Sequence, residues 1–112
     1  MRGEQWLRKP AQYAVVYRGG RVRVNNLVVI KVLPNGLSWS RYGFSISRRV
    51  GGAVVRNRLK RLLREMLSKM PLEGGWDVVF VLRPKAARVK YASLEESVSR
   101  LLSEANLLKR VG

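Results

Sequence analysis

The sequence predicts an α+β fold: a two-layer sandwich in which one small sheet, of about four strands, packs with three helices. Apolar residues recur at helical spacing in a basic middle segment and near the C-terminus, and the short runs between helical segments are rich in Val, as strands are. With 112 residues, 46% of them hydrophobic, the chain can bury one core, so we expect a single domain over residues 1–112. The expected order is helix, three strands, helix, strand, helix.

The first element is expected to be a short helix in KPAQYAVVYRGG. Pro10 suits a first helical turn, and Gly19–Gly20 suits a left-handed cap. Tyr13, Val16 and Tyr17 fall on one face of this helix. Because Val and Tyr also favour sheets, a strand is the alternative for this segment.

Four strands are expected in the remainder of the chain. The segments RVRV, NLVVIKVL and RYGFSIS have the β-branched and aromatic composition of strands. Between the second and third of them, Asn35 and Gly36 can take positive φ in a hairpin-like break. In GGWDVVFVL, the uninterrupted apolar run Val78–Leu82 indicates a strand that is buried on both faces.

The last helix has the clearest sequence pattern. Ser93 and Glu96 match a capping box at the start of a helix. The apolar residues that follow at helical spacing predict its buried face: Leu94, Val98, Leu101, Leu102, Ala105 and Leu108.

Positive charge dominates the chain and is separated from the acids. The net charge is +16, and the interval between Glu4 and Glu65 holds 14 basic residues and no acid. Such a field attracts nucleic acid or an anionic membrane. The absence of Cys excludes disulfides and thiolate metal sites, and the apolar runs are too short to span a bilayer. Because MRGEQWLRKP also lacks a signal-peptide pattern, we expect a soluble cytoplasmic protein.

The densest positive charge lies in RNRLKRLLRE, residues 56–65. On a helix these residues separate into an apolar arc, which docks on the core, and a polar arc, which faces outward. Because like charges one turn apart repel each other, the cluster indicates a polyanionic ligand, although a merely solvated face is the alternative. The apolar arc is Leu59, Leu62, Leu63, Met66, Leu67 and Met70. The polar arc is Asn57, Lys60, Arg61 and Arg64, flanked by Arg56 and Arg58.

The residues before this helix also suit a phosphate ligand. Arg48 and Arg49 are expected at the end of a strand, and Gly51–Gly52 lets the backbone approach a ligand closely. Free N–H groups at a helix start favour phosphate as well. Arg, whose planar fork suits bidentate phosphate contacts, outnumbers Lys by 16 to 7. These features favour binding of RNA or DNA.

The side chains argue against catalysis by the polypeptide. There is no His to act as a general base near neutral pH, and a two-metal nuclease needs several convergent carboxylates. Asp77 is expected to open a strand alone, and Glu65 to form a structural salt bridge with Arg61. Capping explains Glu95 and Glu96. We therefore expect no catalytic residue and no metal site on this chain.

Residues 41–65, RYGFSISRRVGGAVVRNRLKRLLRE, resemble the signature of the protein subunit of bacterial ribonuclease P, which includes [KR]-[KR]-x-G-x-A-V-x-R-N-R-x-K-R-x-x-R-E. The resemblance extends over nearly the whole chain through LRKPAQYAVVYRGG, GGWDVVFVLRPKA and SLEESVSRLLSEANLL. Arg48 and Arg49 replace the usual Lys pair and keep its charge. Tyr13 replaces the common Phe and keeps a stacking face, whereas Ser68 replaces an Arg that is frequent in the family.

The resemblance implies a function, partners and a cofactor. Proteins of this family join a catalytic RNA, expected here as one protein to one RNA, which removes the 5′ leader from precursor tRNA with Mg²⁺ held mainly by the RNA. The basic helix follows a left-handed β-α-β crossover and contacts the catalytic RNA, and a cleft between the sheet and the first helix holds the leader. Carried over by position, the RNA-binding residues are Arg48, Arg49, Arg56, Asn57, Arg58, Lys60, Arg61 and Arg64, and the leader-binding residues are Tyr13, Tyr17 and Lys31.

Alternatives stay open at this point. Tyr13 and Tyr17 could simply pack the first helix on the core. The whole chain could be a ribosomal or general RNA-binding protein, which shares the small basic α+β form. An amphipathic membrane-surface protein is a third reading, but it requires an exposed leucine face that a domain of this size needs for its core.

Overall fold

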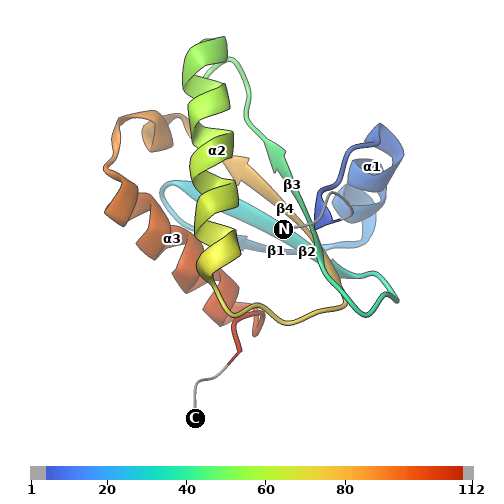
Figure 1. The fold of residues 1–112 in the computed structure, drawn as a ribbon. Helices are drawn as coiled ribbons and strands as arrows, with labels where there is room; N and C mark the ends of the chain where they lie inside the picture. The colour runs from blue at the N-terminus through green and yellow to red at the C-terminus, as the bar shows by residue number, and fades with distance from the viewer. Residues whose placement is uncertain (1–4, 110–112) are drawn as a thin grey trace.

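The computed structural model describes residues 5–109 and contains one four-stranded sheet with helices on both faces (Figure 1). The order of elements confirms the predicted α-β-β-β-α-β-α succession, with one added 3-10 helix before the last α-helix. The elements are α1 (Pro10–Gly19), β1 (Arg21–Val24), β2 (Val28–Pro34), β3 (Arg41–Ser45), α2 (Ala53–Lys69), β4 (Trp76–Leu82), η2 (Pro84–Arg88) and α3 (Tyr91–Glu104).

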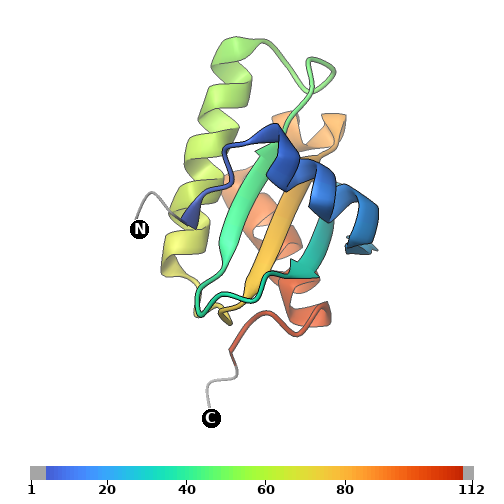
Figure 2. The same ribbon diagram turned by 90° about the vertical axis from the view of Figure 1, so that its right-hand side faces the viewer.

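The sheet has the strand order β1-β2-β4-β3. β2 pairs antiparallel with both β1 and β4, whereas β3 and β4 are parallel neighbours joined through α2. Figure 2 shows β3 to the left of β4 with both strands running upward and α2 behind the sheet, so the crossover is left-handed. Parallel crossovers are right-handed in about 98% of cases, so this connection is an unusual feature of the fold.

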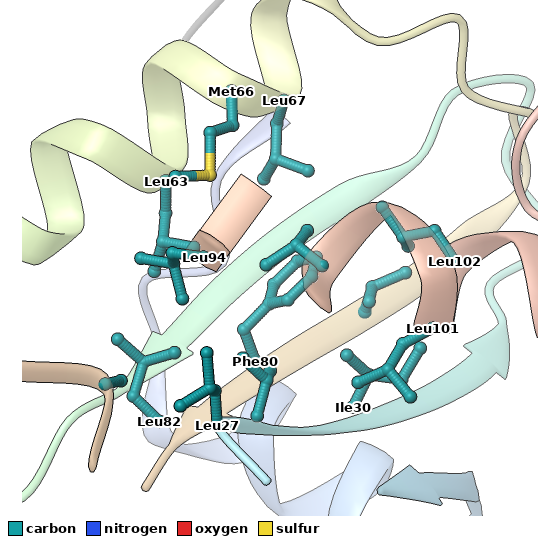
Figure 3. Packing of buried hydrophobic residues seen from close by; sticks show 14 of the residues in the cluster. Leu27, Ile30, Leu63, Met66, Leu67, Phe80, Leu82, Leu94, Leu101 and Leu102 are labelled. Atoms are coloured by element: carbon teal, nitrogen blue, oxygen red, sulfur yellow. The ribbon is translucent and has the colours of Figure 1, made fainter. Parts of the chain in front are cut away.

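The main core lies between the sheet and the two long helices. Figure 3 shows Phe80 of β4 and Ile30 of β2 pointing toward leucines of α2 and α3. Phe80, Ile30 and Leu63 are all fully buried. The apolar arc predicted for the basic helix is confirmed: its buried residues are Leu59, Leu63, Met66 and Leu67, and Leu62 and Met70 pack against them.

A second, smaller core lies on the opposite face of the sheet, under α1. Val16 of α1 packs on Val79 of β4 and is fully buried, and Leu7 completes the cluster. Along β4, Val78, Phe80 and Leu82 therefore face one core while Val79 faces the other. This confirms the prediction that β4 is buried on both faces.

α1 begins as predicted but ends differently. Pro10 opens it as expected, and the Gln12 side chain accepts hydrogen bonds from the backbone N–H groups of Arg8 and Lys9. The predicted left-handed cap at Gly19–Gly20 is wrong, because Gly20 has φ −78° and leads directly into β1. Glycine is needed there for space instead: a Cβ on Gly20 would lie 2.5 Å from the carbonyl oxygen of Val16. The predicted positive φ is found at Gly36, with φ 73°.

The capping box predicted for the last helix is also wrong. α3 begins at Tyr91, with Lys90 as its N-cap, because η2 brings the chain into the helix earlier than the sequence pattern indicated. Ser93 is thus inside the first turn and donates its backbone N–H to the Lys90 carbonyl. The Glu96 carboxylate accepts a hydrogen bond from Arg100 at 2.8 Å instead of capping. Leu108 lies beyond the helix and forms a β-bridge with Leu72.

The segment before α1 extends the sheet past β3. Trp6 forms an isolated parallel bridge with Tyr42, and the Leu7 backbone N–H donates to the Tyr42 carbonyl at 2.8 Å. This segment therefore covers the outer edge of β3 and leaves β1 as the open edge of the sheet. Within residues 5–109, no helix has the length and apolar character that crossing a membrane requires.

Candidate nucleic-acid interface

The outward side of α2 carries five cations and one amide, here together called the α2 ridge: Arg56, Asn57, Arg58, Lys60, Arg61 and Arg64. Because the leucine side of α2 is buried, these residues are turned away from the core. Arg58, Arg61 and Arg64 are exposed, as is Asn57, whereas Arg56 and Lys60 are half-buried. The predicted separation of apolar and polar arcs is confirmed, and the binding role of the ridge stays a prediction.

The ridge has no acidic partner of its own in the part of the chain that the structure describes. The predicted pair between Glu65 and Arg61 is wrong, because Glu65 instead accepts from Lys69, one turn further along α2, at 3.1 Å. Burial also leaves the Nε–H of Arg56 without a hydrogen-bond partner within residues 5–109. The exposed cations of the ridge, Arg58, Arg61 and Arg64, are therefore available to an external anion.

The N-terminal end of α2 continues this basic surface. Arg48 and Arg49 are exposed in a turn that Val50, which is buried, ties to the core. Gly52 is the N-cap and provides no side chain to bind the first N–H groups of the helix. Such groups favour an anion. A Cβ on Gly51 would lie 2.8 Å from the Val55 side chain, so glycine is required here for close packing.

One cation of the ridge is held by aromatic rings, a feature that sequence reasoning missed. The Arg64 guanidinium lies 5.5 Å from the centre of the Trp6 ring and 5.9 Å from that of Phe44. These distances are those of cation–π contacts. Trp6 comes from the segment before α1, so the contact depends on long-range packing, and no local sequence pattern predicts it.

The residues predicted to bind the leader lie together on the other face of the sheet. The Tyr13 and Tyr17 rings are 6.5 Å apart, and the Lys31 ammonium lies 4.6 Å from the centre of the Tyr17 ring. Tyr17 is 40% exposed, so its ring is accessible at the surface. The structure thus brings all three residues into one cluster, here called the tyrosine cluster.

Tyr13 is held more firmly than Tyr17 and has a packing role. Its hydroxyl donates to the Leu7 carbonyl at 3.3 Å and accepts from the Phe44 backbone N–H at 3.2 Å. Its ring covers Gly43, where an added Cβ would lie 2.7 Å from ring atoms. Packing on the sheet therefore accounts for Tyr13, as the alternative interpretation proposed, and Tyr17 has the more accessible ring.

Two valines extend the surface beside the tyrosine cluster and were not predicted as site residues. Val22 and Val24 of β1 are 51% and 55% exposed. Val22 pairs directly with Lys31 across β1 and β2, so the two side chains share a face of the sheet. The alternation in RVRV was the available signal, since it places Val and Arg on opposite faces.

Asp77 does not stand alone, contrary to the prediction. It is buried in β4, and its carboxylate accepts two hydrogen bonds from Arg41, at 2.8 and 2.7 Å, and one from the Asn35 side chain at 2.9 Å. The hydrogen bonds to Asp77 raise the pKa of the Arg41 guanidinium. A carboxylate satisfied in this way fixes the packing of β3 against β4 and has a structural role.

Metal-binding side chains do not gather in the described part of the chain. Residues 5–109 contain no group of three or more His, Cys, Asp or Glu side chains placed to hold a metal ion. Within these described residues no side-chain cluster suits a Mg²⁺ ion, and we assign no step to a metal held by them.

Comparison with known proteins identifies the family. A family model described as Ribonuclease P matches residues 1–106. The ribonuclease P protein component of Dehalococcoides mccartyi is 47% identical over 104 residues, which cover 93% of this chain and 87% of the relative. The one from Caldanaerobacter subterraneus subsp. tengcongensis is 42% identical over 103 residues, covering 90% and 89%.

Solved structures agree with these matches. The RNase P protein of Staphylococcus aureus has a TM-score of 0.86 at 25% identity, covering 94% of this chain and 98% of that one. The Thermotoga maritima protein has a TM-score of 0.82 at 29% identity, covering 88% and 94%. Together with the family match over nearly its full length, these similarities show that the chain belongs to the family of ribonuclease P protein components, subunits of the endoribonuclease that matures the 5′ end of tRNA.

Proposed function

We propose that this chain, as the protein component of ribonuclease P, binds the catalytic RNA through the α2 ridge and the 5′ leader of precursor tRNA through the tyrosine cluster. The observation that carries the proposal is the placement of these two surfaces. α2 covers one face of the sheet and α1, with Tyr13 and Tyr17, lies on the other (Figure 2). Two RNA segments could therefore be bound at once without competing for the same side chains.

Electrostatics supports the assignment of the ridge to the catalytic RNA. Arg58 and Arg61 are exposed and have no acidic partner within residues 5–109. Phosphates would neutralise their mutual repulsion and release condensed counterions, which makes binding favourable and strongly dependent on salt. Arg48 and Arg49 extend the same surface toward the open N–H groups at the start of α2.

The tyrosine cluster suits a single strand better than a duplex. A base stacked on an exposed aromatic ring contributes about 1–3 kcal/mol with little sequence preference, which fits leaders of varied sequence. Tyr17 offers the accessible ring, and Lys31, whose ammonium lies over one face of that ring, offers a cation for a neighbouring phosphate. Val22 and Val24 would form an apolar floor next to them.

Cleavage itself is assigned to the RNA subunit. Among the described residues, Asp77 pairs with Arg41 and Glu65 with Lys69, and no group of three or more carboxylates converges. Mg²⁺ would be held mainly by RNA phosphates. The protein would then raise substrate affinity and reduce repulsion between two RNAs, which lowers the Mg²⁺ that the reaction requires.

Reconstitution tests the proposal. The pure chain and its catalytic RNA, mixed in equal amounts, are assayed at low Mg²⁺ on a precursor tRNA and on a matched precursor whose leader is cut to one nucleotide. We expect the protein to increase capture of the long-leader substrate more than that of the short one. Two results would contradict the proposal. The protein alone could cleave off the leader, or its addition to the catalytic RNA could change neither substrate binding nor the rate of cleavage. The second would favour a general RNA-binding protein.

A further inference from the structure

A second basic segment lies between β4 and α3, outside the surfaces described above. Residues 83–90, RPKAARVK, carry four exposed cations and no acid: Arg83, Lys85, Arg88 and Lys90. We call this segment the η2 patch. Ala86 at its centre is buried in the main core, with 1% of its surface exposed, so the segment is anchored while its cations remain in solvent.

The η2 patch is held in place by an ordered hydrogen-bond network. Arg83 donates from its backbone N–H to the Leu27 carbonyl at 2.8 Å and from its guanidinium to the Asn25 carbonyl at 3.2 Å. The Asn25 side chain donates to the Ser97 carbonyl at 3.1 Å and accepts from the backbone N–H groups of Leu27 and Val28. The end of β4, the β1–β2 turn and α3 are therefore fixed relative to one another.

These elements enclose a polar groove of about 550 Å³. Its walls carry uncharged donors and acceptors as well as cations, including Asn26, Lys85, Ser93 and Ser97. Glu96 is the acid of the lining, and Arg100 binds its carboxylate at 2.8 Å. The groove thus combines net positive charge with groups that can bind hydroxyls.

The η2 patch is continuous with the α2 ridge. The Arg58 guanidinium lies 3.5 Å from the carbonyl oxygen of Ala87 in η2. Figure 1 shows η2 beside the N-terminal half of α2, with the β1–β2 turn next to it. The acid of α2, Glu65, is two turns further along the helix and binds Lys69. A ligand phosphate chain could therefore pass from Arg58 to Lys85 without meeting an unpaired carboxylate of α2 or η2.

We propose that the η2 patch and its groove bind a second segment of RNA backbone, adjoining the segment on the α2 ridge. This inference rests on the proposed function, because it extends the same basic surface. Phosphates would contact Lys85 and Arg88, and the Asn26 and Ser93 side chains suit the sugar 2′-hydroxyl, which distinguishes RNA from DNA. The segment belongs either to the catalytic RNA or to the bound precursor.

Charge-neutralising variants test the inference. Lys85→Gln and Arg88→Gln each remove one cation from the η2 patch, and Lys109→Gln removes one exposed cation beyond the C-terminal end of α3 as the matched control. Binding to the catalytic RNA is measured between about 50 and 200 mM salt, with thermal unfolding to verify the fold. The slope of the logarithm of the binding constant against the logarithm of the salt concentration should be shallower by roughly 0.7–0.9 for each η2 variant. Between about 50 and 200 mM salt, the affinity of each variant should therefore fall by a factor about three times smaller than that of the unmodified protein. Lys109→Gln should leave the slope unchanged.

A second arm separates the two sources of RNA. If the segment belongs to the precursor, the η2 variants should bind the catalytic RNA normally, and the holoenzymes they form should show the reduced slope only with precursor tRNA. Unchanged slopes in both arms would overturn the inference, as would an equal decrease for Lys109→Gln, which would show an effect of net charge alone. Arg61→Ala in the same assay keeps the two proposals distinct. If Arg61→Ala lowers the salt slope and the η2 variants do not, only the role of the η2 patch is contradicted. If neither Arg61→Ala nor the η2 variants change the slope, the role of the α2 ridge is contradicted as well.

Discussion

The Lys31 ammonium lies 4.6 Å from the centre of the Tyr17 ring, although the two residues come from β2 and α1. The contact places a cation over one face of the accessible aromatic ring of the tyrosine cluster. It also orients an RNA strand at the proposed leader site, because a base can stack on the open face of Tyr17 while the adjoining phosphate faces Lys31.

Replacing Tyr17 with Ala should weaken binding of precursor tRNA to the holoenzyme more than binding of mature tRNA. The loss should be about 1–3 kcal/mol if one base stacks on the ring. Tyr17→Phe is the matched control, because it keeps the ring and removes only the hydroxyl, and it should bind nearly normally. Equal losses for precursor and mature tRNA would show that the ring serves packing alone.

Replacing Arg61 with Ala should lower the salt dependence of catalytic-RNA binding by one phosphate contact, roughly 0.7–0.9 in the log–log slope. Arg61 is preferred to Arg64 because Arg64 also contacts the Trp6 ring, so its removal would change packing as well as charge. Lys109→Ala controls for net charge. A slope that stays the same in Arg61→Ala would remove this position from the interface.

Replacing Gly43 with Ala should destabilise the protein by about 1–3 kcal/mol, the usual effect of overpacking. The new Cβ would lie 2.7 Å from atoms of the Tyr13 ring, whose hydroxyl is bound to Leu7 and Phe44 and cannot shift freely. Gly19→Ala is the control, because its Cβ would meet Leu33 at an ordinary 3.4 Å. Urea unfolding measures both, and equal stabilities would contradict the packing described for Tyr13.

Raising the pH above about 10 should reduce stability through Tyr42. Burial raises the pKa of the Tyr42 hydroxyl, which therefore holds its proton more tightly in the folded state than in the unfolded one. Its contribution is fully present below the unfolded pKa and is lost as the pH rises through the folded value. The free energy of unfolding of Tyr42→Phe, measured by urea at a series of pH values, should fall less steeply than that of the unmodified protein. Parallel curves would exclude Tyr42 as the cause.

The sequence predicted those parts of the molecule that depend on periodicity. The leucine arc of α2 and the buried run in β4 repeat at the spacing of their elements, so the faces of Leu63 and Phe80 follow from local pattern. The convergence of Tyr13 and Tyr17 with Lys31 came only through the family resemblance, because their meeting depends on how α1 docks on β2. The same holds for the hand of the crossover.

The features that sequence reasoning missed involve residues far apart in the chain or competition between nearby partners. Arg41 meets Asp77 because β3 and β4 pair in one register, and residue spacing does not indicate that register. Glu65 had cations one turn away on either side, and the structure pairs it with Lys69, at the C-terminal end of α2. Trp6 reaches Arg64 only after the chain before α1 has bridged to Tyr42.

The alternation of side chains along β4 has a geometric consequence for the holoenzyme. Its Phe80 supports α2 and its Val79 supports α1, so one strand carries both proposed RNA surfaces. The distance between the leader and the catalytic RNA would then equal the thickness of a sheet plus a helix of about 10–12 Å diameter. The protein would act as a rigid spacer whose thickness is set by the packing of α1 and α2 on β4. A substitution that changes the volume of a buried β4 side chain would then shift the substrate relative to the catalytic RNA.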